Sequence, residues 1–199
     1  MSSDFTGPYH MRIDAELTLD LPEDDQILPL YRLILLNADH LRPWMDWVDK
    51  VTFSQQLEIT RIWREKPISR GFERVLYLNE EPIGCCGIRV LDSDCAEIGY
   101  WLSEEHTGRG YITRAVRYLI HCGFLHYGLH RVEIHCAKEN TKSRAVPERL
   151  HFTHEASLRE RHKLPSGYHN LEIYGLLRTE WEAHNERYFN SGTMDQRNR

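Results

Sequence analysis

The stretch with the clearest chemical potential is a glycine-containing turn between a predicted strand and a predicted helix. It reads Trp101-Leu-Ser-Glu-Glu-His-Thr-Gly-Arg-Gly-Tyr-Ile-Thr, so Gly108 and Gly110 lie directly before the helix. Glycine lets the backbone turn sharply and lets a ligand approach closely. The first N–H groups of a helix have no partners within it, and the helix dipole favours an anion there. We therefore expect the segment 106–111 to hold a pyrophosphate through main-chain donors, with Arg109 adding charge.

The turn alone is a weak signal. A helix start that merely needs flexible residues would look the same. It is not a Walker loop, because no Gly-Lys-Ser/Thr follows, and it lacks the third glycine of the dinucleotide fingerprint. Its meaning therefore depends on the elements around it.

The spacing of apolar residues predicts those elements. Strands are expected near 13–21, 72–78, 83–90, 95–102, 131–137, 152–160 and 168–178, and helices from Pro22 to before Pro43 and over 53–66, 109–126 and 141–150. The strand–helix–strand order from 95 to 137 is a βαβ unit with two parallel strands. Antiparallel hairpins precede and follow it. The fold class is therefore expected to be α/β, with a mixed sheet flanked by helices.

The same spacing predicts which side chains are buried. The helix over 109–126 carries an amphipathic stripe made of Ile112, Ala115, Val116, Leu119, Ile120 and Gly123. The helix over 53–66 is expected to bury Leu57, Ile59, Ile62 and Trp63. The strand over 95–102 places Ile98, Tyr100 and Leu102 on one face and Glu97, Gly99 and Trp101 on the other.

Length and charge limit the classes of protein. The 199 residues suit one domain over 12–182, with an N-terminal extension at 1–11 and a C-terminal tail at 183–199 that is mobile at its end. A formal charge of −5 argues against binding nucleic acid through bulk charge. Neither a signal peptide nor a stretch long enough to span a membrane is recognisable.

The cysteines indicate the compartment. There are five, an odd number, and they lie in strand-like or helix-like segments rather than in loops. Reduced thiols in a cytoplasmic protein fit this pattern better than a disulfide framework.

Three consecutive stretches resemble motifs of the GCN5-related N-acetyltransferase (GNAT) superfamily. They are Ala96-Glu-Ile-Gly-Tyr-Trp-Leu, Gly108-Arg-Gly and the segment from Asn140 to Phe152. The family's acetyl-CoA loop reads Arg/Gln-x-x-Gly-x-Gly/Ala, and the most similar branch is the Rim-type ribosomal-protein serine/alanine N-acetyltransferases. The resemblance implies a mostly antiparallel, twisted sheet whose central parallel pair splays apart around the acetyl group, and acetyl-CoA as the cofactor.

The resemblance also implies which residues bind the coenzyme. They are Trp101, Leu102, Ser103, His106, Thr107, Gly108, Arg109, Gly110, Tyr111, Ile112, Thr113, Asn140 and Ser143. Two positions depart from the family pattern. Glu105 stands where the loop usually has Arg or Gln, and Pro147 stands where many members carry a Tyr that serves as general acid. Pro147 also lacks an N–H, which frees a carbonyl in the turn before it.

Acetyl transfer to an amine needs a base, and the departing thiolate benefits from an acid. By family position Glu97 is the first choice for the base, acting through water, with Glu160 and His162 as second choices. A solvated strand glutamate is the alternative for Glu97. Ser143 is the choice for the acid, in place of the missing Tyr. For Ser143 and Asn140 the alternative is helix capping.

The acceptor is expected to lie between Trp44 and Trp47 on one wall and Tyr168, His169 and Tyr174 on the other, although the two tryptophans fit core or dimer contacts equally well. The branch implies a protein N-terminal amine as acceptor and a homodimer as assembly. A small amine such as a polyamine or antibiotic is the alternative acceptor. A CoA-binding regulatory protein without catalysis is the alternative function.

Two further chemistries are not expected. Cys122 and His126 are one helical turn apart among twelve histidines, but no tight pair-and-pair spacing of metal ligands exists, so we expect no metal. Cys95 and Cys136 have no recognisable activating triad, so we expect direct transfer rather than a covalent acyl-enzyme.

Overall fold

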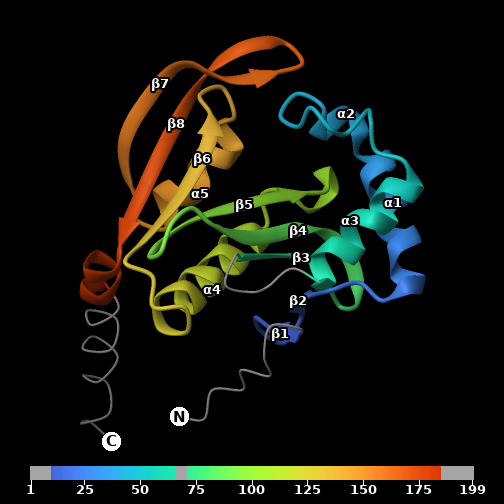
Figure 1. The fold of residues 1–199 in the computed structure, drawn as a ribbon, viewed down its shortest axis with the longest axis horizontal. Helices are drawn as coiled ribbons and strands as arrows, with labels where there is room; N and C mark the ends of the chain where they lie inside the picture. Colours follow the sequence, from blue (N-terminus) through green and yellow to red (C-terminus); the bar gives the residue numbers. More distant parts are fainter. Residues whose placement is uncertain (1–9, 66–70, 185–199) are drawn as a thin grey trace, which may run out of the picture.

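The computed structural model describes residues 10–65 and 71–184, and within these ranges the strands form one sheet (Figure 1). The strands are β1 (His10–Arg12), β2 (Leu17–Asp20), β3 (Gly71–Leu78), β4 (Glu81–Val90), β5 (Cys95–Leu102), β6 (Arg131–Ala137), β7 (Thr153–Leu164) and β8 (Gly167–Leu177). The helices are η1 (Asp24–Gln26), α1 (Ile27–Leu36), α2 (Ala38–Leu41), α3 (Phe53–Glu65), η3 (Glu104–His106), α4 (Tyr111–Leu125) and α5 (Thr141–Arg149). The strand order is β1-β2-β3-β4-β5-β6-β8-β7.

The parallel pair lies at the centre of this sheet, as predicted. β5 and β6 run parallel and are connected by α4, whereas the other neighbouring strands are antiparallel. Pairing between β5 and β6 ends at Glu97 and Glu133. β5 nevertheless stays paired with β4 as far as Leu102, and β6 stays paired with β8 as far as Ala137. The two strands therefore separate halfway along, which confirms the expected splay and fold class.

Helices cover the two faces of the sheet and enclose two apolar cores. The predicted stripe of α4 is buried and packs against β4, β5 and β6. On the opposite face, Leu30 and Ile34 of α1 pack on Val75 of β3 and Cys85 of β4. The strand over 95–102 divides as predicted, because Ile98 belongs to the larger core and Trp101 packs against the smaller one.

The buried face predicted for α3 is wrong for three of its four residues. Leu57, Ile59 and Ile62 are exposed, whereas Trp63 packs against the smaller core. Gln56 and Thr60 are instead 3% and 0% exposed. These two polar residues lie one helical turn apart, and the Thr60 hydroxyl donates to the Gln56 carbonyl at 2.9 Å. Local hydrogen bonding removes much of the cost of burying them, and hydropathy alone does not register this.

The N-terminal segments also differ from the prediction. The strand expected near 13–21 is shorter, because β2 covers only Leu17–Asp20, and β1 at His10–Arg12 was not predicted. In the turn between them the Asp14 side chain accepts the N–H groups of Glu16 and Leu17. The first helix is interrupted at Asn37, which separates α1 from α2 before Pro43.

The two chain ends lie mostly outside the described residues. This applies to the predicted extension at 1–11 and to the tail at 183–199, so the division into domains stays a prediction. A helical backbone from residue 178, which was not predicted, follows β8 to the end of the described range. The five cysteines are free thiols, as predicted. No helix within 10–65 or 71–184 is both long and apolar enough to cross a bilayer.

Candidate active site

The glycine turn has the conformation that its sequence predicts. Gly108 and Gly110 have φ angles of +76° and +80°, in the left-handed region. A Cβ atom on either would meet nothing within 4 Å, so backbone conformation rather than packing requires glycine. The first helical hydrogen bond runs from the Arg114 N–H to the Gly110 carbonyl at 3.0 Å. The N–H groups of residues 111–113 precede that bond and are available to an anion.

A cavity of about 580 Å³, here called the turn cavity, lies beside this turn. It is lined by the turn itself, the first turns of α4, Asn140 and Ser143 of α5, and Trp101 and Leu102 of β5. Many of the predicted coenzyme-binding residues thus surround one space. Ser103, His106 and Arg109 do not line it. The Ser103 hydroxyl contacts Nδ1 of His106 at 2.7 Å and so supports the turn from behind.

The turn cavity is positively charged. Four of its lining residues are Arg or Lys and none is Asp or Glu, the four cations being Arg114, Arg117, Lys142 and Arg149. Arg114 is also paired with Asp14 and Glu16. Cationic side chains beside main-chain N–H groups without a helical partner can together bind a ligand that has several phosphates. The site therefore fits a coenzyme of the CoA type. The sequence analysis missed this cluster, although Arg114 and Arg117 are three residues apart at the start of α4.

The start of α5 links Ser143 to a residue that the sequence analysis did not select. Asn140 caps the helix, because its side chain accepts the Ser143 N–H at 3.1 Å. The Ser143 hydroxyl donates to the Tyr100 hydroxyl at 3.2 Å, and Tyr100 donates to the Ser143 carbonyl at 3.0 Å. That carbonyl lies four residues before Pro147 and is the one that the missing N–H frees. Burial raises the pKa of the Tyr100 hydroxyl, so it stays protonated.

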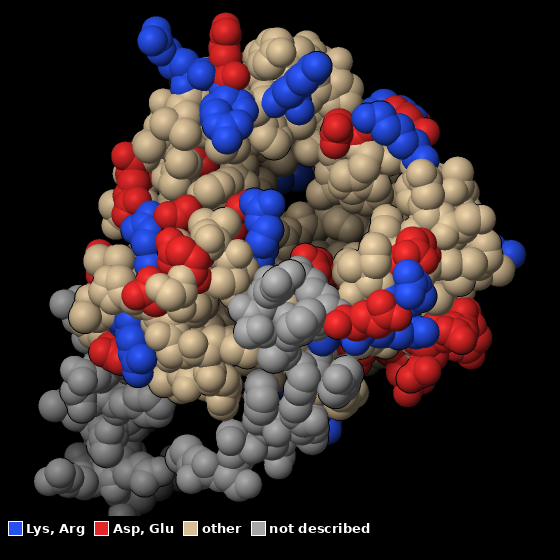
Figure 2. All heavy atoms as spheres, viewed as in Figure 1, with Lys and Arg blue, Asp and Glu red and all other residues tan. Residues whose placement is uncertain are grey.

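A second cavity of about 450 Å³, here called the tryptophan cavity, lies on the face covered by α1 and α3. Trp47, Trp63 and Trp101 line it together with aliphatic side chains, and its charged residues are Glu73, Arg89 and Glu97. Figure 2 shows this face hollowed near its centre. The two cavities share Met45, Tyr100 and Trp101 as lining residues. They therefore meet where β5 separates from β6.

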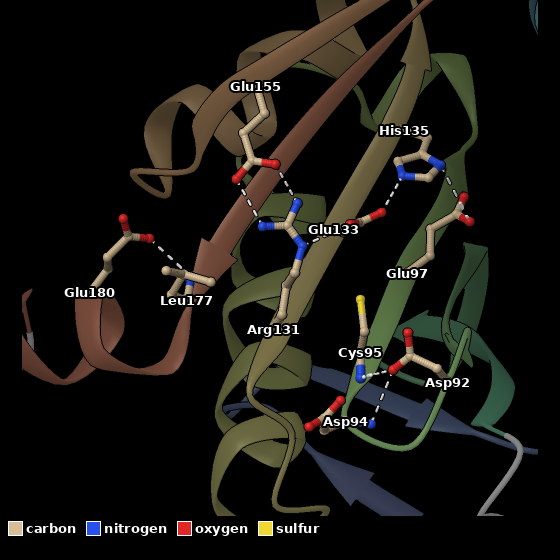
Figure 3. Close-up of polar contacts among 10 residues, drawn as sticks. All are labelled: Asp92, Asp94, Cys95, Glu97, Arg131, Glu133, His135, Glu155, Leu177 and Glu180. Atoms are coloured by element: carbon tan, nitrogen blue, oxygen red, sulfur yellow. Dashed lines mark hydrogen bonds and ion pairs between the residues drawn. The ribbon is translucent and has the colours of Figure 1, made fainter.

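Glu97 lines the tryptophan cavity at the last position of β5 that pairs with β6. Its carboxylate is 17% exposed, forms an ion pair with Arg89 and lies 3.6 Å from Nδ1 of His135. Figure 3 shows Glu97 and His135 pointing toward each other from neighbouring strands. The carboxylate is thus partly buried and held by specific partners, unlike a freely solvated strand glutamate.

The two second-choice bases lie on β7. His162 is half-buried, and burial lowers its pKa, with His169 acting in the same direction while Asp46 and Glu97 raise it. His162 lines neither of the two cavities described here. Glu160 is exposed, and its N–H donates to the side chain of Asn170.

The residues predicted to form the two walls of the acceptor site do not surround one common cavity. Trp47 lines the tryptophan cavity, whereas Trp44 lines the turn cavity. Tyr168 is 65% exposed and lines neither of the two cavities described here. His169 contacts Ser166 and Glu139. Tyr174 is a core residue, 2% exposed, and its hydroxyl lies between Arg144 and Glu148.

Within the described ranges, no three His, Cys, Asp or Glu side chains come together in a way that could hold a metal ion.

Comparisons with known proteins agree with this geometry. Residues 16–153 match a family model described as an acetyltransferase (GNAT) domain. The chain is similar to YdaF of Bacillus subtilis (strain 168), a protein named as a candidate ribosomal N-acetyltransferase, with 34% identity covering 86% of this chain and 97% of that protein. It is also similar to the ribosomal-protein-serine acetyltransferase of Escherichia coli (strain K12), with 28% identity covering 84% of this chain and 96% of that one.

The fold has a counterpart among solved structures. RimL, a ribosomal L7/L12 alpha-N-protein acetyltransferase solved in complex with coenzyme A, superposes with a TM-score of 0.78. The sequence identity is 21%, and the match covers 86% of this chain and 99% of that one. At this identity the likeness shows a common fold.

Proposed function

Given that this chain belongs to the GCN5-related N-acetyltransferase (GNAT) family and is an acetyl-CoA-dependent N-acetyltransferase, we propose that its acceptor is a protein N-terminal amine of the ribosomal-protein type. Two relatives named for ribosomal acetylation, matched over nearly their whole length, support this acceptor. The observation that carries it is the junction of the two cavities at Tyr100 and Trp101, beside Glu97. A chain end that enters the hollow brings its amine to this junction.

The turn cavity supplies the coenzyme site. The N–H groups at the start of α4 and the cations Arg117, Lys142 and Arg149 neutralise the phosphates. Bound acetyl-CoA supplies the acetyl group as a thioester, whose carbonyl carbon the amine attacks. N–H groups of β5 beyond Glu97 have no strand partner in β6 and are available to the carbonyl oxygen.

Two side chains transfer protons in this proposal, and a third holds one of them in place. Glu97 removes the proton from the acceptor ammonium, because an ammonium cannot attack a carbonyl. Ser143, held by Tyr100, donates to the leaving sulfur. The tryptophan cavity surrounds the amine with apolar walls, which strengthens the electrostatic interaction with Glu97.

The acceptor is tested by direct acetylation. The purified protein is incubated with acetyl-CoA and with separated ribosomal proteins, a Ser-initiated peptide carrying the L7/L12 N-terminal sequence, the same peptide with a blocked N-terminus, and a panel of polyamines and aminoglycosides. We expect thiol release and a mass shift confined to free protein or peptide N-termini. Acetylation of small amines alone would contradict the protein acceptor. Saturable acetyl-CoA binding without thiol release for any amine would favour the regulatory alternative.

A further inference from the structure

Glu97 belongs to a row of charged and titratable side chains that crosses the sheet beside the splay. In spatial order the row is Arg89, Glu97, His135, Glu133, Arg131 and Glu155, from strands β4, β5, β6 and β7. Figure 3 shows the row from Glu97 to Glu155. Glu97 reaches the tryptophan cavity, and the other members from His135 onward lead away from it.

The hydrogen bonds fix the tautomer of His135. Its Nε2 lies 2.6 Å from Oε2 of Glu133. A carboxylate can only accept, so Nε2 carries the hydrogen and a neutral imidazole keeps Nδ1 unprotonated. Nδ1 is the atom that lies 3.6 Å from Oε2 of Glu97. His135 therefore has a proton-accepting nitrogen beside Glu97 and a carboxylate behind it.

The carboxylate behind His135 is itself held in place. The Nε of Arg131 donates to Glu133 at 2.7 Å, and the two terminal nitrogens of Arg131 donate to both oxygens of Glu155. This pair occupies the space above Gly175 of β8. A Cβ there would lie 2.4 Å from a guanidinium nitrogen and 2.6 Å from a Glu155 oxygen, so a larger residue would require the ends of these two side chains to move.

Both contacts of Glu97 fall on the same oxygen. Arg89 and His135 each approach Oε2. Among the described residues no hydrogen bond or ion pair involves Oε1, which is the oxygen available to an acceptor. The carboxylate is thus connected on one side to the cavity and on the other to His135.

We propose that His135 and Glu133 form a proton relay that carries the acceptor's proton away from Glu97. The N–H bond of the ammonium breaks and its proton goes to Glu97, which passes it to Nδ1 of His135 through direct approach or one water. The imidazolium then lies between two carboxylates, and its Nε2 proton leaves through Glu133 to solvent. Before the next turnover Nδ1 loses its proton to water and Nε2 regains one through Glu133, which restores the resting tautomer. The free amine forms the C–N bond as the C–S bond breaks, and the remaining proton follows the sulfur. The relay rests on acetylation of an amine and not on which amine is the acceptor.

The titratable and charged groups around His135 come from four strands. They are Arg89 of β4, Glu97 of β5, Arg131 and Glu133 of β6, and Glu155 of β7. His162 of β7 interacts electrostatically with Glu97. The β8 residue opposite His135 is the apolar Ile173.

The test replaces His135 by glutamine, which can form hydrogen bonds but cannot take up or release a proton. For His135→Gln we expect kcat about 100-fold lower at pH 7, with the KM for acetyl-CoA unchanged. The deficit shrinks as the pH rises past about 8, where an N-terminal amine is already deprotonated. Glu133→Gln changes kcat in the same direction. The acceptor probe is the Ser-initiated peptide. If that peptide is not acetylated, the probe is tyramine, whose aliphatic amine loses its proton only near pH 10, so the pH range of the test is then extended to about 11.

The matched control is His154→Gln. His154 of β7 also lies 2.6 Å from a glutamate, Glu172, and is not part of the row. We expect it to lower the melting temperature as much as His135→Gln without changing the pH profile. A kcat of His135→Gln within threefold of the unmodified enzyme, or a deficit that is constant from pH 6.5 to 9, overturns the relay.

A readout that does not depend on activity separates this proposal from the proposed function. Nitrogen-15 NMR of the histidines is expected to show His135 with its hydrogen on Nε2 at pH 8, and to lose that fixed tautomer in Glu133→Gln. A hydrogen on Nδ1 overturns the relay, even if neither acceptor probe is acetylated.

Discussion

At the scale of single residues, Tyr100 supplies a hydrogen bond that Pro147 cannot make. Pro147 cannot donate a helical hydrogen bond, so the Ser143 carbonyl needs another donor. Tyr100 provides it from β5 and in return receives the Ser143 hydroxyl. The chain thus places a tyrosine hydroxyl beside Ser143 from the strand, where many family members have one on the helix.

Tyr100→Phe removes both of these hydrogen bonds. We expect a loss of about 1–3 kcal/mol in the free energy of unfolding, because the Ser143 carbonyl loses its donor. The value of kcat also falls, since the Ser143 hydroxyl loses the partner that orients it. Urea unfolding and thiol-release kinetics measure the two effects. Tyr168→Phe, at a tyrosine that is largely exposed, is the control and is expected to change neither.

Glu97→Gln tests the base directly. We expect kcat to fall about 100-fold, because glutamine cannot take up the proton. The dissociation constant of acetyl-CoA, measured by calorimetry, stays the same, since Glu97 lines only the tryptophan cavity. Glu73→Gln removes a second carboxylate from the same cavity and shows how much of the loss comes from charge alone. A variant with undiminished turnover removes the assignment of Glu97.

At the scale of elements, the glycine turn and α4 together form the proposed phosphate site. The left-handed backbone of the turn exposes the first N–H groups of the helix, and the amphipathic stripe fixes the helix on the sheet. Phosphate binding therefore depends on the conformation of the turn as well as on its charges.

Comparing Gly110→Ala with a control variant separates the effect of the turn's conformation on coenzyme binding from a general loss of stability. Any L-residue at this φ angle costs about 1 kcal/mol, and here it also moves the N–H groups. We expect the KM for acetyl-CoA to rise while kcat changes little. Gly128→Ala is the matched control, because Gly128 has φ +66° and open space around its Cβ position at the other end of α4. It is expected to lose similar stability with no change in KM. Equal effects of the two variants on KM would contradict this account.

The elements were mostly predictable because their signals are local. The α4 stripe and the βαβ order need only the spacing of neighbouring residues. The buried face of α3 was not predictable, because Gln56 and Thr60 satisfy each other in a way that hydropathy does not detect. The row through His135 was missed because Arg89, Glu133 and Glu155 meet only after strand register is set. The cations of the turn cavity were missed because α4 and α5 bring them together from separate segments.

At the scale of the whole molecule, burial keeps the cysteines out of the chemistry. It raises the pKa of Cys95, Cys122 and Cys136 to about 11, so their thiols are protonated at neutral pH. We expect intersecting double-reciprocal plots for acetyl-CoA and acceptor, as for a ternary complex. Intact-mass analysis after incubation with acetyl-CoA alone should show no acetylated enzyme. Parallel plots together with an acetylated cysteine would instead indicate a covalent intermediate.

The separation of β5 from β6 beyond Glu97 and Glu133 also has a consequence for how the coenzyme and the acceptor enter and leave the enzyme. In the proposed arrangement the coenzyme occupies the turn cavity and the acceptor occupies the tryptophan cavity, and the two spaces meet at Met45, Tyr100 and Trp101 beside this gap. With a separate cavity for each, neither product would have to pass the other on leaving. A protein acceptor much larger than the enzyme could then stay docked while spent coenzyme is exchanged, so acceptor size would place no limit on how fast the coenzyme is renewed.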